Sequence, residues 1–190
     1  MDRYYTIIDN NIITAETAEI LYKLGYDNVL PCPNDFERGK YIVVDRELVL
    51  NPNWEEEQLA KAKENKFKEN ETIRDEFLVS GVIYRDILWD SDIEQKLNIS
   101  VQVANMSDED TVVWVAMDGV TSLECTKQDL LNIGMLLTQM TAYVWQYKNP
   151  EIKVAIANAQ TLEELEAIEI VYSLEEINAE PDNIEEAEEL

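Results

Sequence analysis

The chain of 190 residues contains no histidine and only two cysteines. Histidine is the commonest general base and the commonest neutral metal ligand, and it activates the nucleophile in Ser-His and Cys-His sites. Its absence therefore argues strongly against hydrolases of these classes. Cys32 and Cys125 lie far apart without a CxxC spacing, which supports neither a disulfide framework nor a structural zinc site. We expect two isolated, reduced thiols.

Basic residues and long apolar runs are also scarce. The 15 basic residues stand against 40 acidic ones, which gives a formal charge of −25 at pH 7. This charge opposes binding to nucleic acid, to phosphate-rich substrates and to anionic bilayers, whereas basic protein surfaces remain attractive. No apolar run approaches the roughly 18 residues that indicate a membrane span, and the first residues lack the pattern of a signal peptide. We therefore predict a cytoplasmic protein with neither a nucleic-acid nor a membrane partner.

What is present indicates an α+β fold. The hydrophobic fraction of 46% is sufficient for one core of ordinary size. Residues 1–53 are predicted to form a small α+β unit in which two hairpins flank one short helix. The signals are the turn Asp9-Asn10-Asn11, an N-cap at Thr14, a helix end at Gly25 and the turn Asp45-Arg46.

Residues 54–76 are predicted to be a helical spacer. Asn53 followed by Glu56 is a recognisable helix start, and the helix should run from about Trp54 to Arg74. Its apolar residues are too sparse for a wide core-facing stripe. Two interpretations remain open, a solvated spacer and a weak coiled-coil strand.

Residues 77–170 are predicted to alternate hairpins with capped helices. The first hairpin should pair Phe77–Val79 with Val82–Leu88, and the second should turn at Asp118-Gly119. The predicted caps are Ser91 with Glu94, Thr126 with Asp129 and Thr161 with Glu164, and Pro150 should end the helix that begins after Thr126. Gly134 lies inside that helix, so we expect close helix packing around it.

This second half resembles the phage-tail domain of unknown function 4376 over residues 77 to about 170. The order and spacing of the following residues carry the resemblance: Phe77, Gly81, Asp90-Ser91-Asp92, Leu97-Asn98-Ile99, Val113-Trp114-Val115, Asp118-Gly119-Val120, Leu130, Ile133-Gly134, Gln139, Ala155-Ile156, Thr161 and Glu163-Glu164-Leu165-Glu166-Ala167-Ile168. The resemblance implies an association with phage or prophage tail fibres and baseplates. It supplies no catalytic residues.

Carboxylate pairs are the only candidates for catalysis or metal binding. Asp90 with Asp92, or Asp108 with Asp110, has the residue types of a glycosidase acid and nucleophile or of calcium ligands. However, the first pair stands where a helix cap is expected, and the second lacks the glycine and the distal glutamate of an EF-hand loop. We predict no catalytic site, no metal and no cofactor.

The predicted function is therefore binding. Residues 171–190 form an acidic tail that we expect to be either solvated or a docking peptide that orders on a partner. Trp114 and Trp145 are expected in the core. The candidate partner-binding residues are Trp54, Phe67, Trp89, Glu175, Glu176, Glu185 and Glu186. We expect a noncatalytic tail fibre assembly factor or chaperone that acts in the host cytoplasm and binds a tail fibre or baseplate protein. The oligomeric state is left open, with a homo-oligomer among the alternatives. The alternative function is a permanent component of the virion tail fibre or baseplate.

Overall fold

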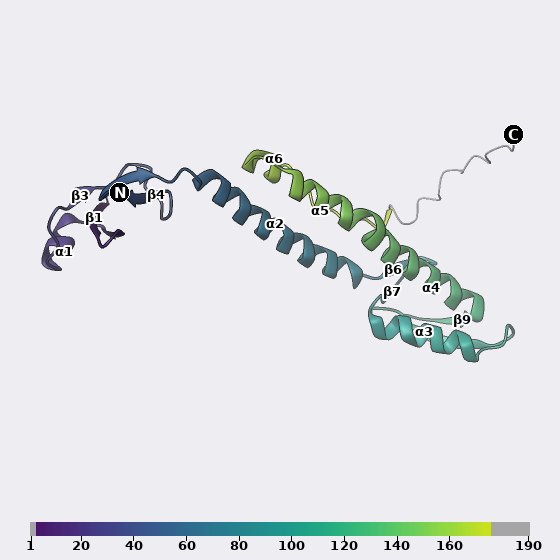
Figure 1. Cartoon of the computed structure of the whole chain (residues 1–190). Helices are drawn as coiled ribbons and strands as arrows, with labels where there is room; N and C mark the ends of the chain where they lie inside the picture. Colours follow the sequence, from purple (N-terminus) through teal and green to yellow (C-terminus); the bar gives the residue numbers. More distant parts are fainter. Residues whose placement is uncertain (1–2, 176–190) are drawn as a thin grey trace, which may run out of the picture. The chain divides into compact units, whose positions relative to one another are not determined.

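The computed structural model describes residues 3–175 and has the predicted α+β fold (Figure 1). The chain divides into two compact units, and the boundary between them falls inside the long helix α2 (Trp54–Leu78). Unit 1 ends at Lys61 and unit 2 begins at Ala62. The helix predicted from residue 54 is confirmed and continues four residues beyond its predicted end at Arg74, to Leu78.

Unit 1 contains the two predicted hairpins. β1 (Tyr4–Ile8) lies between β2 (Asn11–Ala15) and the short β3 (Leu30–Pro31), and both pairings are antiparallel. β4 (Tyr41–Val44) and β5 (Glu47–Leu50) form a separate antiparallel pair. Both tight turns have two residues with positive φ, at Asp9 and Asn10 and at Asp45 and Arg46. This is the backbone that two-residue hairpins require.

The helix of unit 1 is shorter than the sequence indicated. α1 spans Ala18–Lys23, and its N-cap position is Thr17. The prediction that Thr14 caps this helix is wrong, because Thr14 lies inside β2, where it pairs with Tyr5 of β1. Gly25, with φ of 84°, follows the end of the helix as predicted, and the N–H of Tyr26 donates to the carbonyl of Leu21.

Unit 2 consists of helices and two separate hairpins. Its hairpins are β6 (Val82–Tyr84) with β7 (Ile87–Trp89) and β8 (Thr111–Val115) with β9 (Ser122–Thr126). Its helices after α2 are α3 (Ile93–Asn105), α4 (Lys127–Ala142), the π-helical turn η1 (Tyr143–Lys148), α5 (Asn149–Asn158) and α6 (Leu162–Glu166). None of the helices in residues 3–175 is both long and apolar enough to cross a membrane.

The prediction that Phe77–Val79 forms a strand is wrong. Phe77 and Leu78 end α2, and the hairpin lies entirely within residues 82–89, where Arg85 and Asp86 adopt the positive-φ turn. Gly81 joins the helix to the hairpin with φ of 92°, and a Cβ there would lie 2.7 Å from the carbonyl oxygen of Trp89. Glycine is therefore required at this position.

Ser91 does not cap α3, contrary to the prediction. The N-cap is Asp92, whose Oδ1 accepts a hydrogen bond of 2.7 Å from the N–H of Gln95. Ser91 is buried instead, where its hydroxyl donates to the carbonyl of Leu78 and accepts from the N–H of Gly81. It therefore satisfies backbone groups at the end of α2. By contrast, the predicted capping box of Thr126 with Asp129 and the cap of Thr161 are confirmed.

Pro150 does not end the helix that begins after Thr126. The backbone stays helical from α4 through η1 into α5, and Pro150 lies at the start of α5. A proline lacks the N–H for the i−4 hydrogen bond, and its ring collides with the carbonyl of that residue in a regular α-helix. The π-helical turn immediately before it widens the backbone, which lets the chain pass Pro150 without stopping.

The second half of α2 packs against this continuous helix, so the solvated-spacer interpretation does not hold there. The two helices run in opposite directions, and Figure 1 shows α2 beside α5. Four contacts mark the pairing: Lys63 Nζ donates to the carbonyl of Ala157, Asn70 bonds Asn149, the Arg74 guanidinium covers the Trp145 ring, and Phe77 meets the Tyr143 ring. The face is polar and aromatic, which is why apolar periodicity did not reveal it.

The core of unit 2 lies where β6–β7, β8–β9, α3 and α4 meet. It is formed by the buried residues Val82, Trp89, Ile99, Met106, Ala116, Cys125, Leu130, Ile133, Leu137 and Met140. The two hairpins thus cover one side of α4 while α3 lies along another.

Candidate binding groove between two helices

The strongest candidate site in unit 2 is a groove between α3 and α4. The two helices run side by side in opposite directions, because Ile99 in the middle of α3 packs on Gly134 while Lys96, a turn earlier, reaches Thr141 (Figure 1). Their buried sides, which include Ile99, Ile133 and Leu137, face the core. Ile99 and Leu137 also line the groove from below, beside more exposed side chains of both helices.

The groove has a floor and two ends. The floor consists of Ile99, Ser100, Gly134 and Thr138, which line both of its parts. One part, of about 350 Å³, extends to Lys96, Thr141, Trp145 and Gln146. The other, of about 440 Å³, extends to Val103, Leu131, Met135 and Gln139. We call the whole surface the α3–α4 groove, the first part its lysine end and the second its apolar end.

Gly134 keeps the floor low. A Cβ at this position would lie 3.6 Å from Cγ2 of Ile99, an ordinary van der Waals distance. The expected close packing of helices around Gly134 is therefore present, because Ile99 of α3 lies against it, although an alanine would also fit. What the missing side chain provides is open space, because any larger residue at Gly134 would project into the groove.

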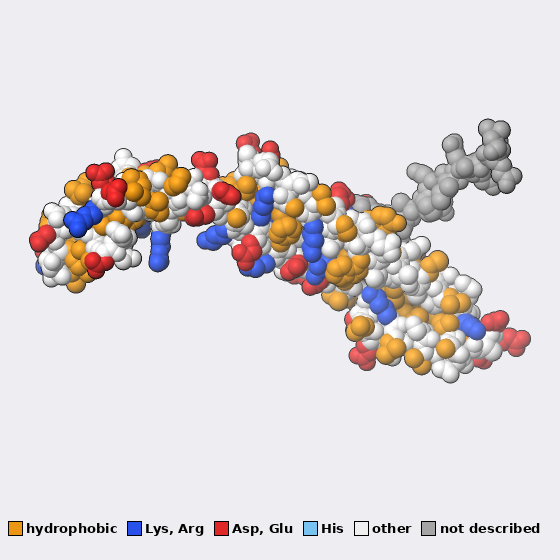
Figure 2. All heavy atoms as spheres, viewed as in Figure 1, with side chains coloured by type: hydrophobic (Ala, Val, Ile, Leu, Met, Phe, Trp, Pro, Cys, Tyr) orange, Lys and Arg blue, Asp and Glu red, His pale blue; other side chains and the backbone are white. Residues whose placement is uncertain are grey.

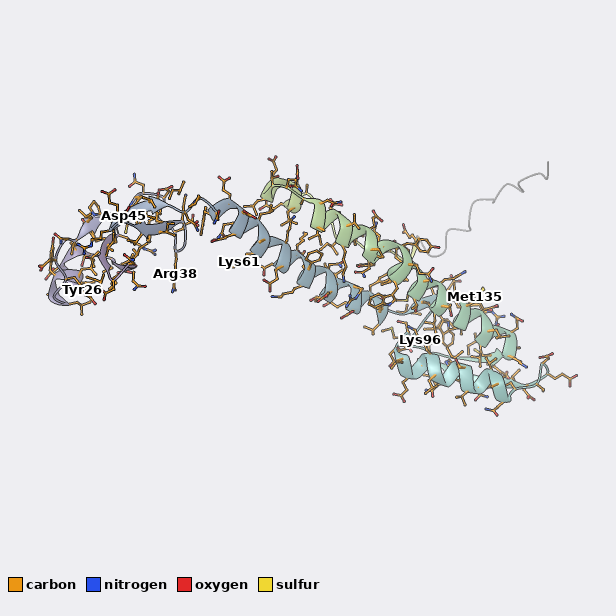
Figure 3. All side chains as sticks on the ribbon, viewed as in Figure 1. Tyr26, Arg38, Asp45, Lys61, Lys96 and Met135 are labelled. Carbon is orange, nitrogen blue, oxygen red and sulfur yellow. The ribbon has the colours of Figure 1, made fainter. Side chains whose placement is uncertain are left out.

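Large apolar side chains stand exposed around the groove. On the α4 side, Met135 is 54% exposed and Trp145 is 48% exposed. On α3, Leu97 and Val101 are also exposed and lie one turn apart, but neither lines the groove. Figure 3 labels Lys96 on α3 and Met135 on α4. Trp145, expected in the core, instead stands half exposed at the lysine end, with the Arg74 guanidinium 4.7 Å from its ring centroid.

This region is uncharged in an otherwise highly charged chain. Charged residues make up 29% of the sequence, yet residues 97–107 and 130–147 contain none. These two runs form most of α3 and α4. Figure 2 shows mainly hydrophobic and uncharged side chains over this part of unit 2. Exposed apolar surface on a soluble protein is typical of an interaction site when it is contiguous and bordered by polar residues.

Among residues 3–175, Lys96 is the one charged residue that lines the groove. Its ammonium lies 3.4 Å from the hydroxyl of Thr141, and no carboxylate among residues 3–175 lies within ion-pair distance of it. Burial lowers the pKa of Lys96, against a raising effect of Asp92 one turn earlier. The groove therefore holds a partly desolvated cation without a direct anionic partner in the described part of the chain.

The carboxylates considered for catalysis are engaged in local structure. Asp90 Oδ1 accepts from the N–H of Asp92, and Asp92 caps α3. Asp110 accepts from the N–H of Ser107, while Asp108 lies 3.4 Å from the Lys127 ammonium. Within residues 3–175 no three Asp, Glu or Cys side chains are grouped so that they could hold a metal ion.

Asp129 is the most buried of the acidic residues described. Burial alone would raise its pKa, but hydrogen bonds from the backbone and hydroxyl of Thr126 and from Tyr84, with the charge of Arg85, hold the pKa below its ordinary value. It closes the capping box of α4 and ties that helix to the β6–β7 hairpin. Asp129 thus has a structural role.

None of the predicted partner-binding residues within residues 3–175 lines the α3–α4 groove. Trp89 is 1% exposed and its indole N–H donates to the carbonyl of Tyr84, so it has no surface to offer a partner. Trp54 packs over Gly39 within unit 1, and Phe67 is half-buried on α2. Glu175 is exposed, and Glu176, Glu185 and Glu186 lie outside the described residues.

The groove residues were not found from the sequence. The available signal was the pair of uncharged runs, at 97–107 and 130–147, in a chain with such a high charge content. Comparison with known proteins adds no assignment: no family model matches the chain, and neither a curated protein nor a solved structure was found that matches it.

Proposed function

We propose that this chain is a noncatalytic binding protein that holds a segment of a partner protein in the α3–α4 groove. The observation that carries the proposal is an open groove with exposed apolar sides, placed in the uncharged stretches of a strongly acidic chain. Burial of this surface by a partner would remove Met135 and Trp145 from water, and removal of apolar surface from water is the main driving force for protein association.

Two features support a noncatalytic role. The sequence has no histidine, and the aspartate pairs that could serve a glycosidase act as caps and turn acceptors. A glycosidase needs one carboxyl group free to donate a proton and another free to act as nucleophile or base. Turnover of purified peptidoglycan that is lost in both Asp90→Asn and Asp92→Asn variants would contradict the noncatalytic role.

The resemblance of residues 77–170 to the phage-tail family supports the choice of partner. On that basis the partner is a tail fibre or baseplate component, and the chain acts in the host cytoplasm as an assembly factor or chaperone for the fibre. The high negative charge suits a soluble escort, because it discourages association between copies of the escort itself. The second candidate, also from the resemblance, is a permanent component of the virion tail.

Co-expression with the tail fibre subunit tests the proposal. We expect the two proteins to co-purify, and we expect the yield of folded, trimeric fibre to fall when the chain is omitted. Mass spectrometry of purified virions then separates the two roles, since an assembly factor is absent from mature particles. Fibre that folds equally well alone contradicts the chaperone role, and stoichiometric presence in virions favours the structural one.

A further inference from the structure

We infer that the occupant of the α3–α4 groove is an amphipathic helix with an apolar face and a carboxylate side chain placed to meet Lys96. This inference rests on the proposed function and specifies the chemistry of its partner. The parts that carry it are the shape of the groove, the small residues on its floor, and the charge at one end.

The shape fits a helix. The groove runs along two antiparallel helices, so a third helix can lie in the valley between them, as in other helix-in-groove complexes. Its floor carries the small side chain of Ser100 and the bare backbone of Gly134, which allow a helix backbone to approach closely. The apolar sides, with Met135 on α4 and Val103 on α3, match apolar anchors spaced three and four residues apart.

The charge of Lys96 determines which kind of side chain the occupant places at the lysine end of the groove. Lys96 stands at one end of the groove and bonds only the neutral hydroxyl of Thr141 in the described structure, while the other end is apolar. An Asp or Glu of the occupant that reaches Lys96 gives the ammonium the anionic partner that its own surroundings do not provide directly. A lysine or arginine in the same place would meet a like charge in a partly desolvated site.

Two other occupants fit less well. Residues 176–190 of the chain contain seven acidic residues, so laying this segment along the groove would desolvate several carboxylates against a single ammonium. A second copy of the chain would bring together two molecules that each carry a charge of −25. A separate apolar helix with one well-placed carboxylate carries neither cost.

The test uses three synthetic amphipathic helices of identical sequence except at one position in a terminal turn of the apolar face, which is Glu, Gln or Lys. Their binding to the full-length chain is followed by fluorescence anisotropy. We expect the Glu peptide to bind about three- to fivefold more tightly than the Gln peptide, the size expected for a partly exposed ion pair, and the Lys peptide to bind most weakly.

Three variants separate charge from shape. Lys96→Met should remove the preference for Glu, and Lys96→Glu should reverse it in favour of the Lys peptide. Lys68→Met is the matched control, because Lys68 is an exposed lysine on α2 that pairs with Glu64 outside the groove. It should keep the order of the unchanged protein.

Two further variants fill the groove. Gly134→Leu places a side chain on the floor, and Thr138→Phe does the same from an exposed position that does not endanger folding. Both should weaken all three peptides alike. Equal binding of the three peptides to the unchanged chain, no binding of any peptide, or undiminished binding to Thr138→Phe would each overturn the inference.

The same experiment identifies the other occupants. If peptides bind only after deletion of residues 176–190, the chain's own terminal segment is the occupant. If the chain is a dimer that Thr138→Phe dissociates, a second copy is the occupant. Either result overturns the inference. A failure of the tail-fibre assignment is distinguishable, because it appears as a fibre subunit that does not bind the unchanged chain although the peptides keep their order.

Discussion

Replacing Asn70 by leucine tests whether the second half of α2 belongs to the packed body of unit 2. Asn70 is completely buried, and its side chain makes two hydrogen bonds at once. Its Nδ2 donates to Oδ1 of Asn149 at 2.9 Å, and its Oδ1 accepts from the Tyr172 hydroxyl at 2.8 Å. Leucine has a similar volume but can make neither bond.

The cost follows from the groups left behind. Asn149 is 5% exposed, so its side-chain amide oxygen, Oδ1, loses its donor in a place that water hardly reaches. A buried polar group without a partner costs about 1–3 kcal/mol, and each lost neutral hydrogen bond is worth about 1 kcal/mol. The Tyr172 hydroxyl is only half-buried and can turn to water. We therefore expect Asn70→Leu to lower the free energy of unfolding by about 2–4 kcal/mol, and Tyr172→Phe by about 1 kcal/mol.

Urea unfolding followed by circular dichroism measures both changes. Asn65→Leu is the matched control, because Asn65 is an exposed asparagine of the same helix and its replacement should change stability by less than about 0.5 kcal/mol. The double variant Asn70→Leu/Tyr172→Phe should cost less than the two single changes together, since both remove the same bond. If Asn70→Leu is as stable as Asn65→Leu, this part of α2 is a solvated spacer and the described packing is refuted.

Two further predictions concern glycine and pH. Gly81→Ala should lower the free energy of unfolding, measured by thermal unfolding, by about 2 kcal/mol or more, because it combines a positive φ with a Cβ 2.7 Å from the Trp89 carbonyl oxygen. Gly134→Ala should leave the free energy of unfolding unchanged or raise it by up to about 1 kcal/mol. Equal effects of the two variants would contradict the geometry. The pKa of Asp129 is lower in the folded than in the unfolded chain. Its contribution to the free energy of unfolding is therefore present above the ordinary aspartate pKa of about 3.9, and it is lost as the pH falls through the pKa of the folded state. Unfolding free energy measured from pH 6 downward should therefore fall below about pH 5, and the fall should be smaller in Asp129→Asn; an identical pH profile in the variant would show that Asp129 does not contribute.

Local signals in the sequence predicted much of the secondary structure. The turns at Asp9-Asn10 and Asp45-Arg46 were identified because Asp and Asn tolerate positive φ, and the capping box of Thr126 was identified because both of its partners lie three residues apart. These features depend on residues close together in the chain. They are therefore readable without knowledge of the tertiary structure.

The errors arose where distant residues decide the local conformation. The turn at Arg85-Asp86 has no glycine or asparagine, so the hairpin was expected at Ser80-Gly81 instead. The helix continues past Pro150 because a π-helical turn precedes it, and no residue preference announces that turn. The packing at Asn70 was not predicted, because its buried partners, Asn149 and Tyr172, lie far along the chain.

The α3–α4 groove, like these errors, depends on residues that lie far apart in the chain. It exists because α3 and α4 pack side by side with Gly134 between them, and this is a tertiary arrangement. The sequence carries only the uncharged character of residues 97–107 and 130–147. That character does not reveal which side of each helix faces the groove.

A single pair of variants tests most directly whether this groove is the binding surface. Met135 and Val154 are both exposed apolar residues on the continuous helix, at 54% and 58%, but only Met135 lines the groove. Isothermal titration of the tail fibre subunit should show affinity at least about tenfold lower for Met135→Glu, because a charge is placed in an apolar contact, and unchanged affinity for Val154→Glu. Equal affinities for the two variants would contradict a partner bound in the α3–α4 groove.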